Sequence, residues 1–118
     1  MAEDNIDTFY ETLINAEGIH GVVLFRGGSI LRSSLEDKTA ERFISFAEEI
    51  FSKARKSLSK LPSMYGEINF VTIYLQNNMT VLVARHKDIG LIVIARIERS
   101  EPAVIDKIIQ KINEIIGS

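Results

Sequence analysis

Two short segments of this 118-residue chain are apolar at almost every position, and they limit the possible folds more than any other feature. They are GVVLF at residues 21–25 and LIVIARI at residues 91–97. Successive residues of a strand point to opposite faces of a sheet, so a strand that is apolar throughout is covered on both faces. Both segments are far shorter than the ~20 residues that a helix needs to cross a bilayer. The sequence therefore predicts a β-sheet between two layers of helix.

Hairpin turns join most of the strands that the sequence predicts. Gly27-Gly28 supplies the positive φ of a tight turn, and Asn77-Asn78 tolerates left-handed backbone geometry. A third turn is expected at residues 87–90. Since hairpins connect antiparallel neighbours, the sheet is expected to be mainly antiparallel. The predicted strands are residues 21–25, 29–32, 67–75, 79–86 and 91–97. The second of these has the weaker apolar pattern of an edge strand.

Three segments have apolar residues at helical steps of three and four, namely residues 4–16, 37–60 and 101–116. Gly18 is expected to end the first helix, and Asp37 or Thr39 to cap the long one. The element order is then α-β-β-α-β-β-β-α, in a single domain of residues 1–118. We expect an α/β (α+β) three-layer sandwich. Its five-stranded sheet has the long helix on one face and the two terminal helices on the other.

The long helix has more apolar surface than one sheet can cover. One stripe along it is formed by Phe43, Ala47, Ile50, Ala54 and Leu58. Three further residues, Ile44, Phe46 and Phe51, widen the apolar arc beyond the roughly 100° that packing on a sheet requires. A second copy of the same helix is a plausible partner for the excess. Coverage by a neighbouring loop of the same chain is the alternative.

The strand predicted at residues 67–75 is a second candidate contact surface. It follows a loop and leads into a hairpin, so one of its sides is expected to be free. It is apolar and lacks proline, and only Glu67 and the flanking Lys60 would discourage pairing with another chain. An unprotected edge beside a helix with excess apolar surface is the pattern expected of a symmetric dimer that extends the sheet.

The end of the long helix is basic, in the segment KARKSLSK. Lys53, Arg55, Lys56 and Lys60 suit a helix C-terminus, where cations meet the negative end of the helix dipole. They indicate either a solvated helix end or a site for an acidic partner.

The composition excludes several classes of function. The chain has no cysteine, which removes disulfides, thiolate nucleophiles and metal centres built on thiolates. Its 14 Lys and Arg against 16 Asp and Glu give a net charge of −2, with no broad cationic field for nucleic acid. The segment MAEDNIDTFYE lacks the basic start of a signal peptide. We therefore expect a cytoplasmic protein that does not insert into membranes.

The reactive side chains do not form a recognisable catalytic, cofactor or metal site. His20 and His86 lack metal-ligand spacing, and Ser29, Ser33 and Ser34 lack a nucleophile elbow, which favours turn and cap roles. The segment Arg26-Gly27-Gly28-Ser29 joins two strands, whereas a phosphate loop precedes a helix. Glu48, Glu49 and Glu98 are on exposed faces without an apolar pocket to raise a pKa. The sequence gives no reason to expect an enzyme acting alone, or a cofactor.

The order of these segments resembles the roadblock / dynein light chain family over residues 6–97. The resemblance is carried by GIHGVVLFRGGSILRSS, by the long helix that ends in KARKSL, and by FVTIYLQNNMTVLVARHKDIGLIVIA. Gly28-Ser29 stands where many members have an Asp-Gly turn, a departure that affects the turn and not the fold. The final helix, residues 101–116, is similar to that of prokaryotic members, which act with Ras-like small GTPases.

The resemblance implies a roadblock/profilin-like fold and a homodimer, or a heterodimer with a paralogue. In such a dimer the third strands pair and the long helices pack together. The interface candidates are Phe46, Ile50, Phe51, Val71, Ile73 and Leu75. The implied function is an interaction module or scaffold that binds and regulates a Ras-like small GTPase by positioning the partner's own groups. An arginine finger from Arg26, Arg32 or Arg42 is an open possibility that no sequence feature selects.

Two other functions compete with this interpretation. A sheet flanked by helices also describes small-molecule sensory domains of the profilin and PAS kind, but these need an interior cavity with some polar groups. The Val, Ile and Leu that fill the predicted strands leave few such groups. An adaptor without a GTPase, as in a motor-complex light chain, is the second alternative.

Overall fold

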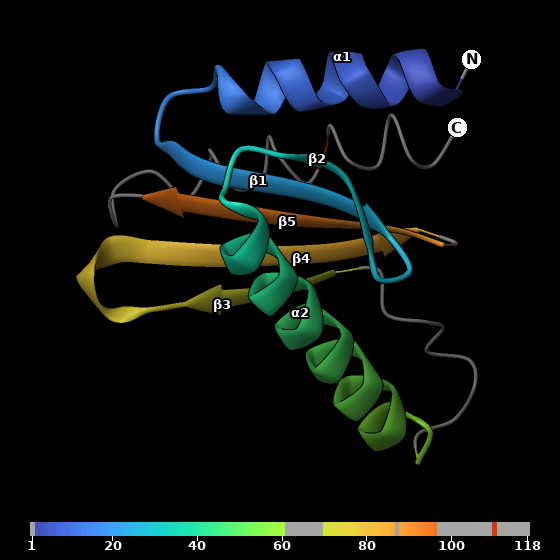
Figure 1. The fold of residues 1–118 in the computed structure, drawn as a ribbon. Coiled ribbons are helices and arrows are strands. Elements are labelled where there is room, and N and C mark those ends of the chain that lie inside the picture. The colour runs from blue at the N-terminus through green and yellow to red at the C-terminus, as the bar shows by residue number, and fades with distance from the viewer. Residues whose placement is uncertain (1, 61–69, 87, 97–109, 111–118) are drawn as a thin grey trace.

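The computed structural model describes residues 2–60, 70–86, 88–96 and 110. Figure 1 shows the elements that these residues form. In order, they are α1 (Ala2–Ile14), β1 (Ile19–Arg26), β2 (Ser29–Ser33), α2 (Asp37–Leu58), β3 (Phe70–Tyr74), the short 3-10 helix η2 (Gln76–Asn78), β4 (Met79–His86) and β5 (Ile89–Arg96). The helix expected at residues 101–116 lies outside the described residues except for residue 110, as do residues 67–69 of the expected third strand.

The described strands form one five-stranded sheet in the order β2-β1-β5-β4-β3. Every neighbouring pair is antiparallel, as the hairpin turns predict. β5 lies at the centre, with β1 on one side and β4 on the other. Both apolar segments therefore supply interior strands, with residues 21–25 in β1 and residues 91–96 in β5. Residue 97 of the second segment lies outside the described residues. The two edges are β2 and β3, in agreement with the sequence.

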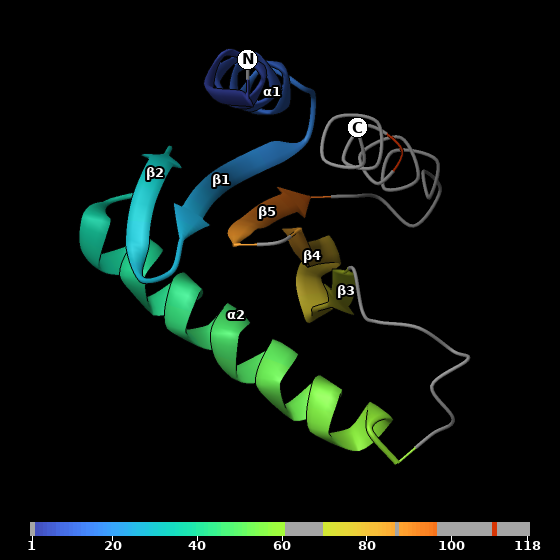
Figure 2. The ribbon, with the colours of Figure 1, turned by 90° about the vertical axis from the view of Figure 1, so that its right-hand side faces the viewer.

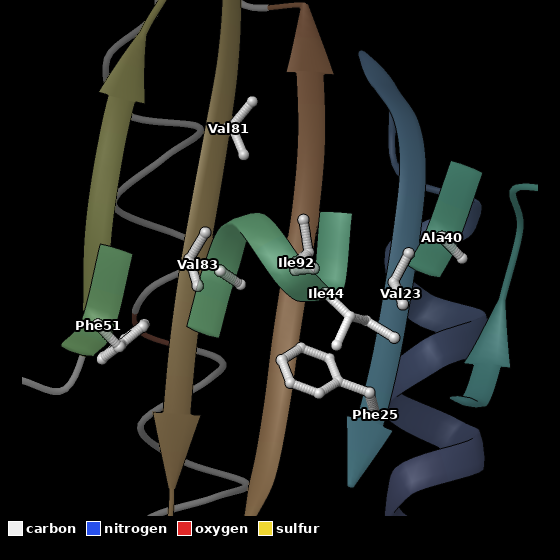
Figure 3. Close-up of a cluster of buried hydrophobic side chains, with 9 residues drawn as sticks. Val23, Phe25, Ala40, Ile44, Phe51, Val81, Val83 and Ile92 are labelled. Atoms are coloured by element: carbon white, nitrogen blue, oxygen red, sulfur yellow. The ribbon is translucent and has the colours of Figure 1, made fainter. Parts of the chain in front are cut away.

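A helix covers each face of the sheet, with α1 on one side and α2 on the other (Figures 1 and 2). Successive residues of the interior strands alternate between the two layers, because side chains of a strand alternate across its sheet. Val22, Leu24, Leu91 and Val93 pack in the cluster beneath α1 with Phe9 and Leu13 of that helix. Val23, Phe25, Val83 and Ile92 pack against Ala40, Ile44, Ala47 and Phe51 of α2 (Figure 3).

The turns confirm most of the turn chemistry expected from the sequence. Gly27 has a φ of 60°, and Asn77 and Asn78 have φ values of 67° and 61°. The third turn is shorter than expected, because Ile89 and Gly90 already belong to β5. Gly90 lies directly opposite Phe25 of β1. A side chain at Gly90 would collide with the Phe25 ring, so this glycine lets the ring lie across the strand.

The last residue of α1 and the first residue of α2 differ from those expected. α1 ends at Ile14, and Gly18 instead sets the approach to β1, with a φ of 85° and a carbonyl that accepts a hydrogen bond from the Arg96 N–H at 2.7 Å. The residue before α2 is Glu36, and it makes no side-chain cap hydrogen bond. The expected caps, Asp37 and Thr39, are wrong because both residues lie inside the first turn.

Candidate interaction surface

β3 presents one open side. Among the described strands it pairs only with β4, in the register Val71↔Val83 and Ile73↔Val81. Directly paired residues of an antiparallel ladder point to the same face. Val83 and Val81 belong to the cluster under α2, so Val71 and Ile73 also face the α2 layer, where both are half-buried. No other strand in the described part of the chain pairs with the outer backbone groups of β3.

Leu75 continues this row of apolar side chains beyond the end of β3. Its N–H donates a hydrogen bond to the Met79 carbonyl at 2.8 Å, which holds it beside the start of β4. The side chain is nevertheless 51% exposed. Val71, Ile73 and Leu75 are spaced at steps of two, so the structure brings three of the sequence-predicted interface residues to one face of one edge.

α2 presents a second uncovered apolar surface along one flank. Its buried residues are Ala40, Ile44, Ala47 and Phe51. The predicted stripe is therefore centred wrongly: of its members only Ala47 is buried, while Phe43, Ile50 and Ala54 are half-buried and Leu58 is exposed. Phe46, on the same flank as Ile50, is 39% exposed. The excess apolar arc of this helix is not covered by the described part of the chain.

Phe51 differs from the other five interface candidates. It is 3% exposed and packs in the cluster between α2 and the sheet (Figure 3). Its side chain therefore stabilises the fold of the single chain and has almost no surface left for a partner. Sequence reasoning could not separate it from Phe46, because both are phenylalanines of the same apolar helix.

Two exposed apolar residues are absent from the predicted interface. Leu58 is 40% exposed, and it is eighteen residues, or five full turns, from the buried Ala40. It therefore lies on the side of α2 that faces the sheet layer, but the last turns of α2 extend past β3 (Figure 2). Tyr74 is 70% exposed and pairs with Thr80, on the α1 side of the edge. The sequence did indicate Leu58 as a candidate contact residue, since it is the last member of the apolar stripe.

An ion pair fixes the opposite flank of α2. Arg85 of β4 donates a hydrogen bond from Nη1 to Glu48 Oε2 at 3.0 Å. Glu48 is two residues from both Phe46 and Ile50, which places it about 200° away around the helix. The charged flank is therefore tied to the sheet, and the apolar flank is left open.

The three arginines considered as possible fingers have different surroundings. Arg26 pairs with Asp88 at 3.2 Å and Arg32 with Asp7 at 2.8 Å, so both are held by carboxylates of the same chain. Arg42 lies on the outer side of α2, in a shallow hollow that it shares with Lys38, Glu41 and Ser45. These positions favour structural roles for Arg26 and Arg32.

The serines near the first hairpin have structural partners. Ser34 Oγ accepts a hydrogen bond from the Val22 N–H at 2.9 Å, and Ser33 Oγ accepts one from the Leu35 N–H at 3.0 Å. Within the described part of the chain, no three His, Cys, Asp or Glu residues are grouped so that they could hold a metal ion. None of the helices in that part is long and apolar enough to cross a membrane.

Comparison with known proteins gives one family and two similar structures. Residues 6–95 match the model of the Roadblock/LC7 domain. A Roadblock/LC7 domain from Streptomyces avermitilis has a TM-score of 0.67 at 14% identity, over 92% of this chain and 94% of that chain. The gliding protein MglB from Thermus thermophilus has a TM-score of 0.62 at 11% identity, over 98% of this chain and 90% of that chain. At these identities the similarity concerns the fold. Among curated protein sequences, none matches significantly.

Proposed function

The chain belongs to the Roadblock/LC7 domain family, and on that premise we propose that it is a dimeric interaction module that regulates a Ras-like small GTPase. The observation that carries the first half of the proposal is the open apolar edge of β3 beside the uncovered flank of α2. Val71, Ile73 and Leu75 lie on one face of this edge, and Phe46 and Ile50 lie on the flank. Exposed apolar surface next to an unpaired strand is a feature that monomeric proteins avoid.

A second copy of the chain fits this surface by symmetry. A two-fold axis beside β3 would pair the strand with its own copy, and one surface would then serve both partners. Leu58 supports this arrangement, because it faces the sheet layer from a part of α2 that extends beyond β3 (Figure 2). The sheet of a second chain would lie where Leu58 points. The pairing would also satisfy the outer backbone groups of β3.

The proposed partner of the dimer follows from the family resemblance. The described residues offer contact surface and no group of His, Cys, Asp or Glu that could hold a metal ion. In this proposal the nucleotide chemistry belongs to the GTPase. A binding module accelerates or restrains such a reaction by holding the partner's own groups in one geometry. The dimer would act as a scaffold whose contribution is orientation.

A sensory domain is less well supported by the interior. The side chains between the sheet and the helices are Val, Leu, Ile, Phe and Ala, and those of both core clusters are at most 5% exposed. Among the described residues that are buried, Thr80 is the one with a polar side chain. Ligand pockets need several convergent polar groups, and these layers do not supply them among the described residues.

Molar mass by light scattering, over a hundredfold dilution series, tests the dimer. The monomer is 13.3 kDa, and we expect about twice this mass at the higher concentrations. A monomer mass throughout the series contradicts self-association and leaves a paralogue as the partner.

Binding to purified small GTPases, loaded with GTP or with GDP, tests the second half. We expect the dimer to bind one nucleotide state more tightly and to change the rate of hydrolysis or exchange. Binding to neither state, with a confirmed dimer, would favour an adaptor without a GTPase. The two measurements are independent, so failure of one does not decide the other.

A further inference from the structure

The basic residues at the end of α2 and just after it lie outside the two core clusters. Lys53, Arg55, Lys56 and Lys60 are all exposed. Lys53 pairs with Glu49 at 2.9 Å, and no acidic residue occurs between Glu49 and Lys60 in the sequence. The four cations thus form a local positive patch, which we call the basic end, on a chain whose net charge is −2.

The helix terminus does not use these side chains to complete its hydrogen bonds. The Ser59 N–H donates to the Arg55 carbonyl at 2.9 Å, and the Lys60 N–H donates to the Ser57 carbonyl at 3.4 Å. Ser59 Oγ donates to the Lys56 carbonyl at 2.7 Å. The carbonyls of Arg55, Lys56 and Ser57 therefore accept from Ser59 and from the Lys60 N–H, and no basic side chain is needed to satisfy these three groups. The cations also gain the general attraction of the helix dipole.

The three lysines of the basic end point away from the proposed dimer surface, whereas Arg55 is one turn from Leu58. Lys56 is two residues from Leu58, which places the two side chains on nearly opposite sides of α2. Lys53 and Lys56 are one turn apart on the outer side, and Lys60 follows two residues after the end of α2. In the dimer proposed above, Leu58 would be covered, whereas this row of lysines would remain in solvent.

We propose that the basic end, with the row Lys53, Lys56 and Lys60 at its centre, is a docking site for an acidic segment of a partner protein. The row is about 10 Å long at the 1.5 Å rise of a helix, which matches about three residues of an extended peptide. Glu or Asp side chains of such a peptide would meet the lysine ammonium groups. Attraction of this kind accelerates association and favours acidic partners over basic ones.

An acidic protein segment fits these observations better than an anionic membrane. A helix that binds a membrane surface places apolar residues beside its cations, so that they enter the lipid. Here the exposed neighbours of the lysine row are Ser52, Ser57 and Ser59, and the apolar Leu58 points to the other side. The remainder of the chain is net acidic and would be repelled by anionic lipid.

The test is binding of a fluorescein-labelled peptide of about ten residues that contains a run of glutamates, measured by fluorescence anisotropy at low salt. The variant Lys56→Glu with Lys60→Glu replaces two attractive contacts by repulsive ones, and we expect about tenfold weaker binding. The matched control, Lys38→Glu with Arg96→Glu, makes the same change in net charge at exposed residues elsewhere. It is expected to bind within about twofold of the original protein.

A milder variant and a map of the site guard against effects on folding. Lys56→Gln with Lys60→Gln keeps good helix formers and should weaken binding by about threefold, with an unchanged thermal melt. In an NMR titration with the same peptide, amide shifts should concentrate at residues 53–60. Equal losses in the basic-end and control variants, or shifts spread over the surface, would overturn the proposal. So would binding to phosphatidylserine vesicles, but not to the peptide, that is lost in Lys56→Glu with Lys60→Glu.

Discussion

β2 and β3 are both five-residue strands at an edge of the same sheet, yet the chain treats the two edges differently. At β2 the register with β1 shifts between Leu24 and Phe25, which marks a bulge or irregularity. Arg32 on this strand pairs with Asp7 of α1. β3 has the sequence FVTIY, with no charge and no irregularity in its register with β4. Bulges and charges are the features by which proteins block strand pairing.

The difference between the edges determines what kind of assembly is possible. A sheet with two open edges can add copies at both and grow into a filament. A sheet with one open edge can pair that edge with its own copy and then has none left. The blocked β2 and the open β3 therefore favour a closed dimer. Four predictions test this contrast. One substitution is on β3, two predictions concern contacts of the β2 edge, and the last concerns a residue away from both edges.

The largest effect is expected for a charge on the open edge. Ile73→Lys places an ammonium group where the proposed dimer is dry, and we expect about a 100-fold higher dimer dissociation constant, or about 2.7 kcal/mol. Sedimentation equilibrium measures this constant. The matched control is Ser29→Lys on β2, which adds the same charge to the blocked edge and should leave the constant unchanged. Equal effects of the two substitutions would show that the edges do not differ.

Ser34→Ala should weaken the blocked edge without affecting self-association. Ser34 Oγ accepts from the part-buried Val22 N–H at 2.9 Å, and removal of the oxygen leaves this donor without its partner. The expected loss is about 1–2 kcal/mol in the free energy of unfolding. Urea denaturation measures the loss, and Ser29→Ala at the exposed first residue of β2 is the control. A changed dimer constant would mean that the two edges are coupled.

The Arg32–Asp7 ion pair should contribute less, because both side chains are about half exposed. A double-mutant cycle with Arg32→Ala and Asp7→Ala should give a coupling energy of about 0.2–1 kcal/mol. In about 1 M salt the coupling should fall towards zero. A coupling that survives high salt would assign the contact to packing of the arginine stem and not to charge.

The smallest effect is expected for Glu49, which touches neither edge. A hydrogen bond from Lys53, and then the charge of Lys53, lowers the pKa of Glu49 below its ordinary value of 4.5. Because the folded-state pKa is lowered, the contribution to stability is present above pH 4.5 and is lost as the pH falls through the folded value. Glu49→Gln should therefore differ slightly from the original protein at about pH 7 and not at about pH 3. Thermal melts at both pH values, with the dimer constant unchanged, would confirm this.

The interior or edge position of several strands and most of the core could be predicted from the residues. The apolar segments at 21–25 and 91–96 are interior strands because a strand that is apolar on both faces has no stable place at a surface. Asn77-Asn78 turns because asparagine tolerates positive φ. The edge position of the third strand followed from its place after a loop and before a hairpin.

The orientation of α2 could not be predicted in the same way. Its apolar residues spread over an arc of about 160°, wider than the roughly 100° that packing on a sheet requires, so their periodicity does not define which part of the arc is buried. Phe46 and Phe51 are chemically alike, and only packing against the sheet separates the exposed residue from the buried one. Capping by Asp37 or Thr39 failed for a related reason. Local propensity allowed several starts, and the helix begins at Asp37 although no side chain caps it.

The sequence by itself determined that this protein is an antiparallel sheet between helices, since apolar periodicity and turn residues are local properties of the chain. Tertiary structure decided which apolar residues remain for a partner. That choice depends on where α2 crosses the sheet and how far it extends past β3, and these are set by packing between residues far apart in the sequence (Figure 2). Whether a side chain is buried depends on how the helices pack on the sheet. The surface left for a partner protein is therefore defined only by the folded chain.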